Sequence, residues 1–378
     1  MRRLVLVGAV HAHAQVLKGW IAAPLRGAER VLISPSALVP FSGMVPRWLT
    51  GHCRLEDICI DFSALAAAAR ARLVIDELVA LEPNRRRLQL RSGSVLDYDV
   101  LSLNVGSTLR PTTPADGIRM LPLRPLAGLR HAWESMLVDI SNDPADAPMN
   151  VTAVGGGAAG VEALLATLAH LRQWQPKRTI HGCLVSAGAA LLPGMSASAV
   201  RHAQAALKAA DVSVRLRTTF SDTERRPNEL VLRATGAQAH AWQSASGLSV
   251  SAGGFIRVDR WLRSVSHHQV HAVGDCAEWI EPLPKAGVYA VRMGSVLSVN
   301  LRAALGAGSL AAFEPQQRFL SLQSTADGRA IASWGRWPVN ARWVGRWKNH
   351  IDRAFLQRFA LTTEAPTPHS LPLPGDSA

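Results

Sequence analysis

Short apolar runs alternate with glycine turns and helical stretches, and this order occurs twice along the chain. The first unit spans 4–33, with a turn at Gly8 and a helical pattern over 12–23. The second spans 151–186, with a helical pattern over 160–173. Strand, turn, helix and strand in this order are typical of a βαβ unit. The pattern therefore predicts an α/β protein that contains two βαβ units.

A glycine-rich motif joins the strand and helix of the second unit, and it reads GGGAAGVE over 155–162. Gly155 permits a tight turn, Gly157 lets a pyrophosphate approach the backbone, and Gly160 lets the helix sit close to the strand. A diphosphate would lie on the helix N-terminus, where free N–H groups and the helix dipole favour negative charge. The alternative, a glycine-rich turn without a ligand, fits the flanking strand and helix less well.

The turn of the first unit keeps only the first glycine of this motif. Val10 stands at the position of the second glycine and His13 at that of the third. A valine directs its side chain toward the phosphates, so the nucleotide is shifted, is bound weakly or does not bind here. His11 and His13 would help to bind a diphosphate if they were protonated; the alternative is that they cap or pack the helix.

A third feature follows the strand expected over 270–273, where Gly274 and Asp275 begin a loop. An aspartate directly after a strand can accept hydrogen bonds from ribityl or ribose hydroxyl groups. A further helix is expected to begin near Lys285. The Gly-Asp pair alone is common in loops, and it gains meaning from its place after the two glycine turns.

The ordered set resembles the FAD-dependent pyridine nucleotide oxidoreductases with two Rossmann domains, a superfamily that includes type II NADH dehydrogenases and sulfide:quinone reductases. The segments that carry the resemblance are 8–13, 104–108, 155–160, 234–236 and 274–275. The chain is still more similar to the flavoprotein module found fused to selenide water dikinase, through the segments 34–36, 41–46, 284–292 and 319–359.

The resemblance implies a fold in which the second Rossmann-like domain is inserted in the first. The FAD-binding domain then takes 1–112 and 266–310, and the NAD(P)H-binding domain takes 113–265. A C-terminal α-rich segment, 311–360, and a disordered tail, 361–378, complete the chain.

The resemblance also implies which residues contact each cofactor. The expected FAD contacts are Gly8, Val10, His11, Ala12, Ser34, Pro46, Gly106, Gly274, Asp275, Lys285 and Ala286. The expected contacts of NADH or NADPH are Gly155, Gly157, Ala158, Gly160, Glu162, Ser186 and Gly236. Lys285 and the helix N-terminus beside it would stabilise the anionic reduced flavin; the alternative for Lys285 is a surface lysine. No metal site is predicted.

The implied reaction is hydride transfer from NADH or NADPH to the flavin, which passes electrons to a quinone or another acceptor. Ser186 stands where an acidic residue would select NADH, so NADPH stays open as the donor. Cys53 and Cys59 do not have the C-x4-C spacing of the disulfide reductases, and a cysteine redox role is not favoured. The alternative function is a non-catalytic or regulatory binding module whose FAD turn has degenerated.

Charge and a C-terminal pattern bear on the partners. The formal net charge of +13 favours anionic partners. Within 341–360, apolar residues recur every four positions, namely Trp343, Trp347, Ile351, Phe355 and Phe359. The basic residues between them are Arg342, Arg346, Lys348 and Arg353. Such a basic amphipathic helix binds an anionic membrane surface or a second subunit of a homodimer.

Two other classes of partner and location are less favoured. Nucleic acid is not expected, because no recognised binding motif accompanies the arginines. The sequence has no apolar run of membrane-spanning length, and its few cysteines suit a reducing compartment. We therefore expect a cytoplasmic protein, either free or peripheral on the inner face of the cell membrane.

Overall fold

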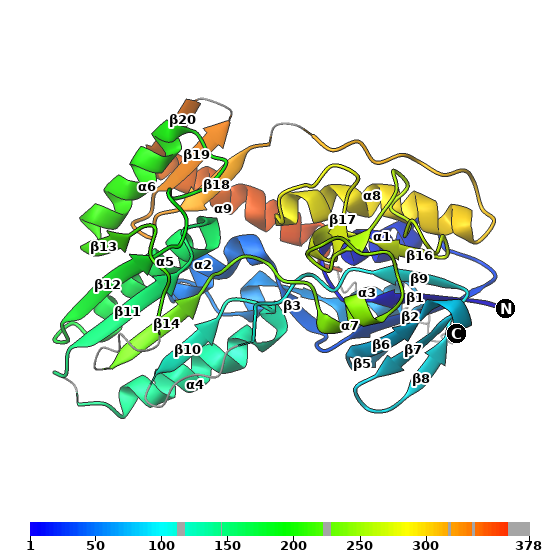
Figure 1. Ribbon diagram of the computed structural model, residues 1–378, viewed down its shortest axis with the longest axis horizontal. Helices are drawn as coiled ribbons and strands as arrows, with labels where there is room; N and C mark the ends of the chain where they lie inside the picture. The colour runs from blue at the N-terminus through cyan, green and yellow to red at the C-terminus, as the bar shows by residue number, and fades with distance from the viewer. Residues whose placement is uncertain (112–117, 145, 222–227, 317–318, 335–336, 362–378) are drawn as a thin grey trace, which may run out of the picture.

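The computed structural model describes residues 1–111, 118–144, 146–221, 228–316, 319–334 and 337–361 (Figure 1). The expected tail, 361–378, lies outside these residues except for Leu361. The first domain is built on a five-stranded parallel sheet in the order β16-β9-β1-β2-β5. Its strands are β1 (Arg2–Val7), β2 (Ala28–Ser34), β5 (Arg72–Ile75), β9 (Val100–Leu103) and β16 (Val270–Ala272). Helices α1 (His11–Ala22) and α8 (Gly287–Ala304) pack against each other, and α3 (Phe62–Ala68) packs on α1.

The second domain repeats this architecture, and it lies on the left of Figure 1. Its five strands are parallel and have the order β10-β14-β11-β12-β13. They are β10 (Arg119–Pro122), β11 (Met149–Val154), β12 (Ile180–Val185), β13 (Val212–Arg215) and β14 (Glu229–Arg233). Helices α4 (Leu129–Ser141), α5 (Ala158–Trp174) and α6 (Ala197–Ala209) cover the sheet. The predicted α/β class with two Rossmann-like domains is confirmed.

One short helix ties the two domains together. Trp48 and Leu49 of α2 (Val45–Leu49) are buried in the same apolar core as Val161 and Leu165 of α5. A shared core of this kind holds two units in a fixed arrangement, because apolar contacts at the seam are lost if the units separate.

Smaller elements complete the first domain. Two antiparallel sheets flank it, made of β3 (Leu38–Pro40) with β4 (Cys59–Asp61), and of β6 (Leu78–Glu82), β7 (Arg87–Leu90) and β8 (Val95–Asp97). The chain returns from the second domain through α7 (Ala241–Ala245) and β15 (Ile256–Arg257), which pairs with β17 (Ala277–Glu278). Leu248 and Val258 lie in the core of the first sheet. These contacts favour a domain boundary near 240, before the 265/266 junction expected from the sequence.

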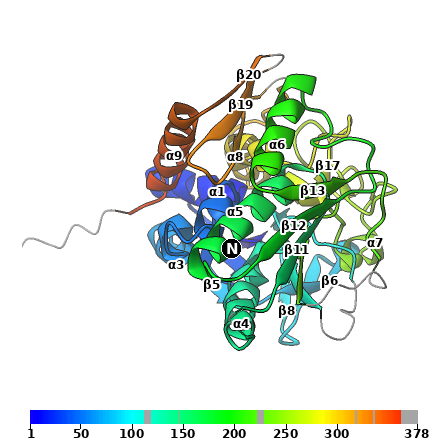
Figure 2. The ribbon, with the colours of Figure 1, turned by 90° about the vertical axis from the view of Figure 1, so that its left-hand side faces the viewer.

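The C-terminal segment forms a third layer. Strands β18 (Ser321–Ser324), β19 (Ala330–Trp334) and β20 (Trp337–Ala341) form an antiparallel sheet, and α9 (Arg342–Gln357) packs on it. Figures 1 and 2 show α9 running from this sheet toward α1 of the first domain. A helix within 341–360 is therefore confirmed.

The prediction that one face of this helix carries all five apolar side chains is wrong. Trp343, Trp347 and Ile351 are 53%, 40% and 37% exposed, whereas Phe355 and Phe359 are buried. A step of four residues turns a helix by about 400°, so the side chains drift by about 40° per step and by about 120° from 343 to 355. Lys348 lies on the buried side with Asp352, its ion-pair partner at 2.7 Å, and therefore cannot supply surface charge.

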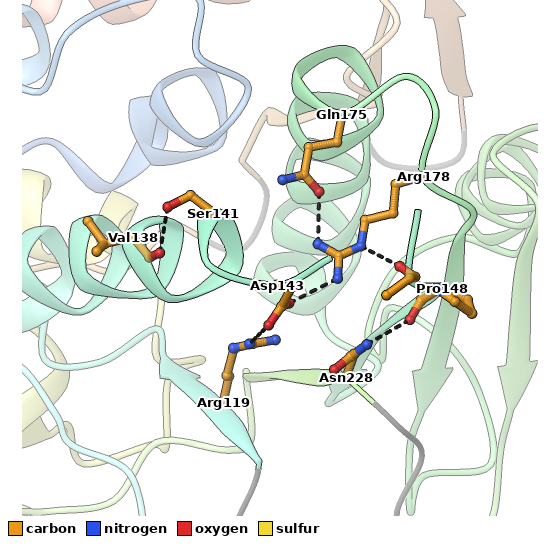
Figure 3. Close-up of polar contacts among 9 residues, drawn as sticks. Arg119, Val138, Ser141, Asp143, Pro148, Gln175, Arg178 and Asn228 are labelled. Atoms are coloured by element: carbon orange, nitrogen blue, oxygen red, sulfur yellow. Dashed lines mark hydrogen bonds and ion pairs between the residues drawn. The ribbon is translucent and has the colours of Figure 1, made fainter. Parts of the chain in front are cut away.

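A buried polar cluster closes the far end of the second domain (Figure 3). The Arg178 guanidinium donates to the Ala147 carbonyl, to Gln175 and to Asp143, whose other oxygen accepts from Arg119. The two guanidinium groups hold the pKa of Asp143 below its usual range, against the effect of burial. These residues lie before β11 and β12 and at the start of β10. They are thus at the amino ends of the strands, opposite the glycine motif, and we assign them a structural role.

Candidate functional site

The first glycine turn is closed tightly between β1 and α1. Gly8 has φ +95°, and a Cβ there would lie 2.2 Å from the Asn104 carbonyl oxygen. A side chain is therefore excluded both by backbone conformation and by space. Helix α1 begins after Val10, and no side-chain cap or first-turn acid occurs among the described residues. The N–H groups of its first turn are thus available to an anion.

The second glycine turn has the same form. Gly155 has φ +128°, and its Cβ would lie 2.3 Å from the Ala234 carbonyl oxygen. A Cβ on Gly160 would lie 2.0 Å from the Gly155 carbonyl oxygen, whereas no described atom lies within 4 Å of the Cβ position of Gly157. Helix α5 also lacks a side-chain cap in the described chain, in contrast to α6, which Ser196 caps. The turn therefore leaves a cradle where a pyrophosphate fits.

Val10 disrupts the first turn less than its sequence position implied. Its backbone, with φ −132° and ψ 179°, lies in the same extended region as that of Gly157, which has φ −79° and ψ 177°. Any residue can adopt this conformation, so the cost of valine is confined to its side chain. The site fits a dinucleotide through its uncapped helix N-terminus.

The two histidines of this turn are buried. Burial lowers the pKa of both His11 and His13 to about 4. This shift disfavours the protonated form that the diphosphate hypothesis requires, and their role in FAD binding stays a prediction. His11 lies 3.3 Å from the Ser42 hydroxyl and packs on Phe41, while His13 is bonded within the turn itself.

Three segments meet at the predicted ribityl-binding aspartate. Asp275 accepts hydrogen bonds from Arg124 at 2.7 Å and from the Ser107 hydroxyl at 3.2 Å. Asn104 lies beside it, and its Oδ1 atom is buried with no partner among the described residues. An orphaned acceptor here suits a hydroxyl-rich ligand. Sequence reasoning did not indicate Arg124, because it is 151 residues from Asp275.

Lys285 lies just before α8, as expected, but its ammonium is already engaged. It donates to the Ala277 carbonyl at 2.6 Å and lies 3.7 Å from the centre of the Phe255 ring. Burial lowers its pKa. A direct effect of Lys285 on the flavin stays a prediction, whereas the N-terminus of α8 at Ala286 has no side-chain cap in the described residues.

Glu162 and Ser186, two predicted NAD(P)H contacts near the second turn, both accept hydrogen bonds from backbone N–H groups. Glu162 accepts a hydrogen bond from the Ser324 backbone N–H at 2.7 Å, and burial raises its pKa to about 7 although nearby Lys348 opposes the shift. The Ser186 hydroxyl accepts from the Gly188 N–H at 3.2 Å. The other predicted positions are distributed between the two turns: Ala12, Ser34, Pro46, Gly106 and Gly274 in the first domain, and Ala158 and Gly236 in the second.

Two glycine turns, each presenting an uncapped helix N-terminus at the carboxyl edge of a parallel sheet, are typical of a protein that binds two dinucleotides. The family model described as pyridine nucleotide-disulphide oxidoreductase matches residues 63–294. The chain belongs to this family. It is an FAD-dependent oxidoreductase that uses NAD(P)H, which decides against a non-catalytic binding module.

Two named relatives are similar in sequence over part of the chain. Ferroptosis suppressor protein 1 of Taeniopygia guttata is 26% identical over 295 residues, which cover 71% of this chain and 72% of that protein. The protein of the same name from Xenopus tropicalis is 30% identical over 186 residues, covering 44% of this chain and 48% of its own length.

Solved structures share the fold. The sulfide:quinone oxidoreductase of Aquifex aeolicus superposes with a TM-score of 0.74 at 14% identity, over 95% of this chain and 91% of that one. NDH2 of Plasmodium falciparum gives a TM-score of 0.73 at 11% identity, over 94% and 98% of the two chains.

The four cysteines are free, and they do not resemble a redox pair. Burial raises the pKa of Cys59 and of Cys276 to about 11, and it also raises that of Cys53. Since the thiolate is the reactive form, these environments disfavour disulfide chemistry.

Proposed function

We propose that this protein passes electrons from NAD(P)H, through FAD, to a quinone at a membrane surface. The observation that carries the proposal is the position of α9. It exposes Trp343, Trp347 and Ile351, and nearer its end it buries Phe355 against Phe41, with ring centres 4.6 Å apart. Phe41 in turn packs on His11 at the FAD turn. One helix thus joins an exposed apolar surface to the turn that would hold the FAD diphosphate, and this path from the surface to the cofactor suits a lipophilic acceptor.

Similar proteins support a quinone acceptor. The Aquifex aeolicus structure is named as a sulfide:quinone oxidoreductase. The raised thiol pKa values argue against the alternative of a cysteine pair that relays electrons.

The chain's own residues would bind and orient the cofactors. Bound FAD would supply the redox chemistry, which is hydride acceptance from NAD(P)H and release of electrons to the acceptor. The α1 N-terminus would hold the FAD diphosphate, and Asp275 with Ser107 would hold the ribityl chain. The α5 N-terminus and the open cradle at Gly157 would hold the NAD(P)H diphosphate. Ser186 offers a hydroxyl where a carboxylate would repel a 2′-phosphate, so both NADH and NADPH are candidate donors.

An anaerobic titration tests the electron path. NADH and NADPH are added separately to the purified yellow protein, and loss of flavin absorbance is followed. Re-oxidation is then started with a short-chain quinone. We expect bleaching by at least one nucleotide and rapid re-oxidation. Bleaching without faster re-oxidation than in the absence of quinone would refute the acceptor and leave the flavoenzyme assignment intact.

We also propose that α9 places the protein on an anionic membrane. No helix among the described residues is long and apolar enough to cross one. Arg342, Arg346 and Arg353 are exposed beside the exposed tryptophans, and such a mixture suits anionic headgroups.

Vesicle sedimentation tests the membrane proposal. The double substitution Trp343→Ser and Trp347→Ser should abolish binding to anionic vesicles, and salt should weaken binding of the unmodified protein. Trp174→Ser is the matched control, because Trp174 is 41% exposed on another helix. Loss of self-association without any vesicle binding would instead assign this surface to a homodimer. The similarity to the flavoprotein module found fused to selenide water dikinase stays a prediction.

A further inference from the structure

The first glycine turn contains a buried imidazole at the position where the second turn has its third glycine. His13 and Gly160 each follow the first glycine of their turn by five positions. In the second turn the helix lies so close that a Cβ on Gly160 would be 2.0 Å from the Gly155 carbonyl oxygen. In the first turn the His13 Nδ1 atom lies 2.6 Å from the corresponding carbonyl oxygen, that of Gly8. A side-chain hydrogen bond in the first turn thus stands where the second turn has the close approach that glycine permits.

The geometry fixes the tautomer of this imidazole. A carbonyl oxygen can only accept, so Nδ1 of His13 must carry the proton. Nε2 then accepts from the Ser102 hydroxyl, 2.9 Å away on β9. His13 and Ser102 are both fully buried, so water cannot replace either bond.

This bond controls the orientation of the peptide that leads into the phosphate-binding helix. The peptide between Gly8 and Ala9 is planar and trans, so its N–H points away from the side on which its carbonyl is held. The Gly8 N–H is fixed as well, through a 2.8 Å bond to the Ile33 carbonyl. Asn104 fills the space beside Gly8. Among the described residues of α1, His13 is thus the only one whose side chain holds the Gly8 carbonyl.

We propose that His13 is a positioning residue for FAD, and that its Nδ1–H bond to the Gly8 carbonyl takes over the task of the third glycine in this turn. The proposal concerns FAD binding only and is independent of the electron acceptor. It also explains how the turn can lack two of the three glycines and keep its shape. The glycine fingerprint makes the opposite prediction, because it implies that a glycine at position 13 would improve the site.

Three substitutions of His13 separate these views. Asn places an amide nitrogen near the position of Nδ1 and can keep the bond to Gly8. Gln places its amide near Nε2, so it keeps the contact with Ser102 and loses the bond to Gly8. Gly removes both. Leu17→Ala is the control for general destabilisation, because Leu17 is fully buried on the same helix and lies away from the turn.

The measurement is the Kd of FAD for the apoprotein, from quenching of flavin fluorescence, with the Tm of each apoprotein measured beside it. We expect His13→Gly and His13→Gln to weaken FAD binding by about tenfold or more, equivalent to about 1.4 kcal/mol. His13→Asn should stay within about threefold of the unmodified protein. Leu17→Ala should lower the Tm with little change in Kd. Nitrogen NMR of the unmodified protein should show the Nδ1–H tautomer of His13.

Three results would overturn the proposal. If His13→Gly binds FAD as tightly as the unmodified protein or more tightly, the glycine fingerprint holds and the imidazole is dispensable. If the Asn and Gln variants lose affinity equally and in proportion to their Tm, His13 only fills space. An Nε2–H tautomer would likewise exclude the proposed bond.

Discussion

Gly157→Val should block NAD(P)H while leaving both the fold and FAD in place. No described atom lies within 4 Å of a Cβ at position 157, and the backbone there is extended, with φ −79°. A valine is therefore accommodated by the protein, and the free energy of unfolding should change by less than about 1 kcal/mol. The side chain would instead occupy the pyrophosphate cradle. Losing only two hydrogen bonds to a charged group, at about 1.5–3 kcal/mol each, corresponds to a fall in NAD(P)H affinity of at least about 100-fold.

Anaerobic stopped-flow reduction measures this effect directly. The variant should be purified yellow, be bleached normally by dithionite and be reduced by NAD(P)H only at greatly raised concentrations. Gly160→Ala is the contrasting control, since its Cβ would lie 2.0 Å from the Gly155 carbonyl oxygen and the variant should lose stability. If Gly157→Val loses FAD and the remaining holoenzyme reacts normally with NAD(P)H, then the assignment of the two turns is reversed.

Three further substitutions test interactions that join the elements. Arg124→Met removes the 2.7 Å ion pair with Asp275, and we expect lower FAD retention on gel filtration, read from the flavin-to-protein absorbance ratio. In the unmodified protein the folded state holds a proton on Glu162 up to about pH 7, so the free energy of unfolding declines between about pH 4.5 and 7. Glu162→Gln should flatten this decline, and urea unfolding at several pH values will measure it. Arg178→Met should lower unfolding free energy by about 3–5 kcal/mol without changing FAD affinity, whereas exposed Arg201→Met should have little effect on either.

The glycine turns could be predicted from the sequence because their requirements are local. Gly8 and Gly155 need a positive φ, and Gly160 needs close approach within its own turn. The interactions that complete the site are not local. Ser102 is 89 residues from His13, and Ser324 is 162 residues from Glu162. Only the fold brings such pairs together, and no spacing rule indicates them.

Buried polar residues also explain why the pattern over 341–360 was misleading. A hydrophobic period assumes that apolar side chains face the protein, but α9 turns Lys348 and Asp352 inward. The inward position is stabilised because Lys348 donates to the Gly43 carbonyl at 2.6 Å as well as to Asp352. The tryptophans are left outside as a consequence of this register.

Deletion of the C-terminal segment would therefore be a poor test of membrane binding. Glu162 of the second domain is bonded to Ser324, and Gly43 of the first domain is bonded to Lys348, so the segment contacts both nucleotide-binding domains. Its removal would also uncover Phe41, which stacks on Phe355. A truncated protein that failed to bind vesicles could have failed because its domains had moved. The exposed tryptophans make none of these buried contacts, and their substitution separates a role in lipid binding from the role of α9 in holding the two domains.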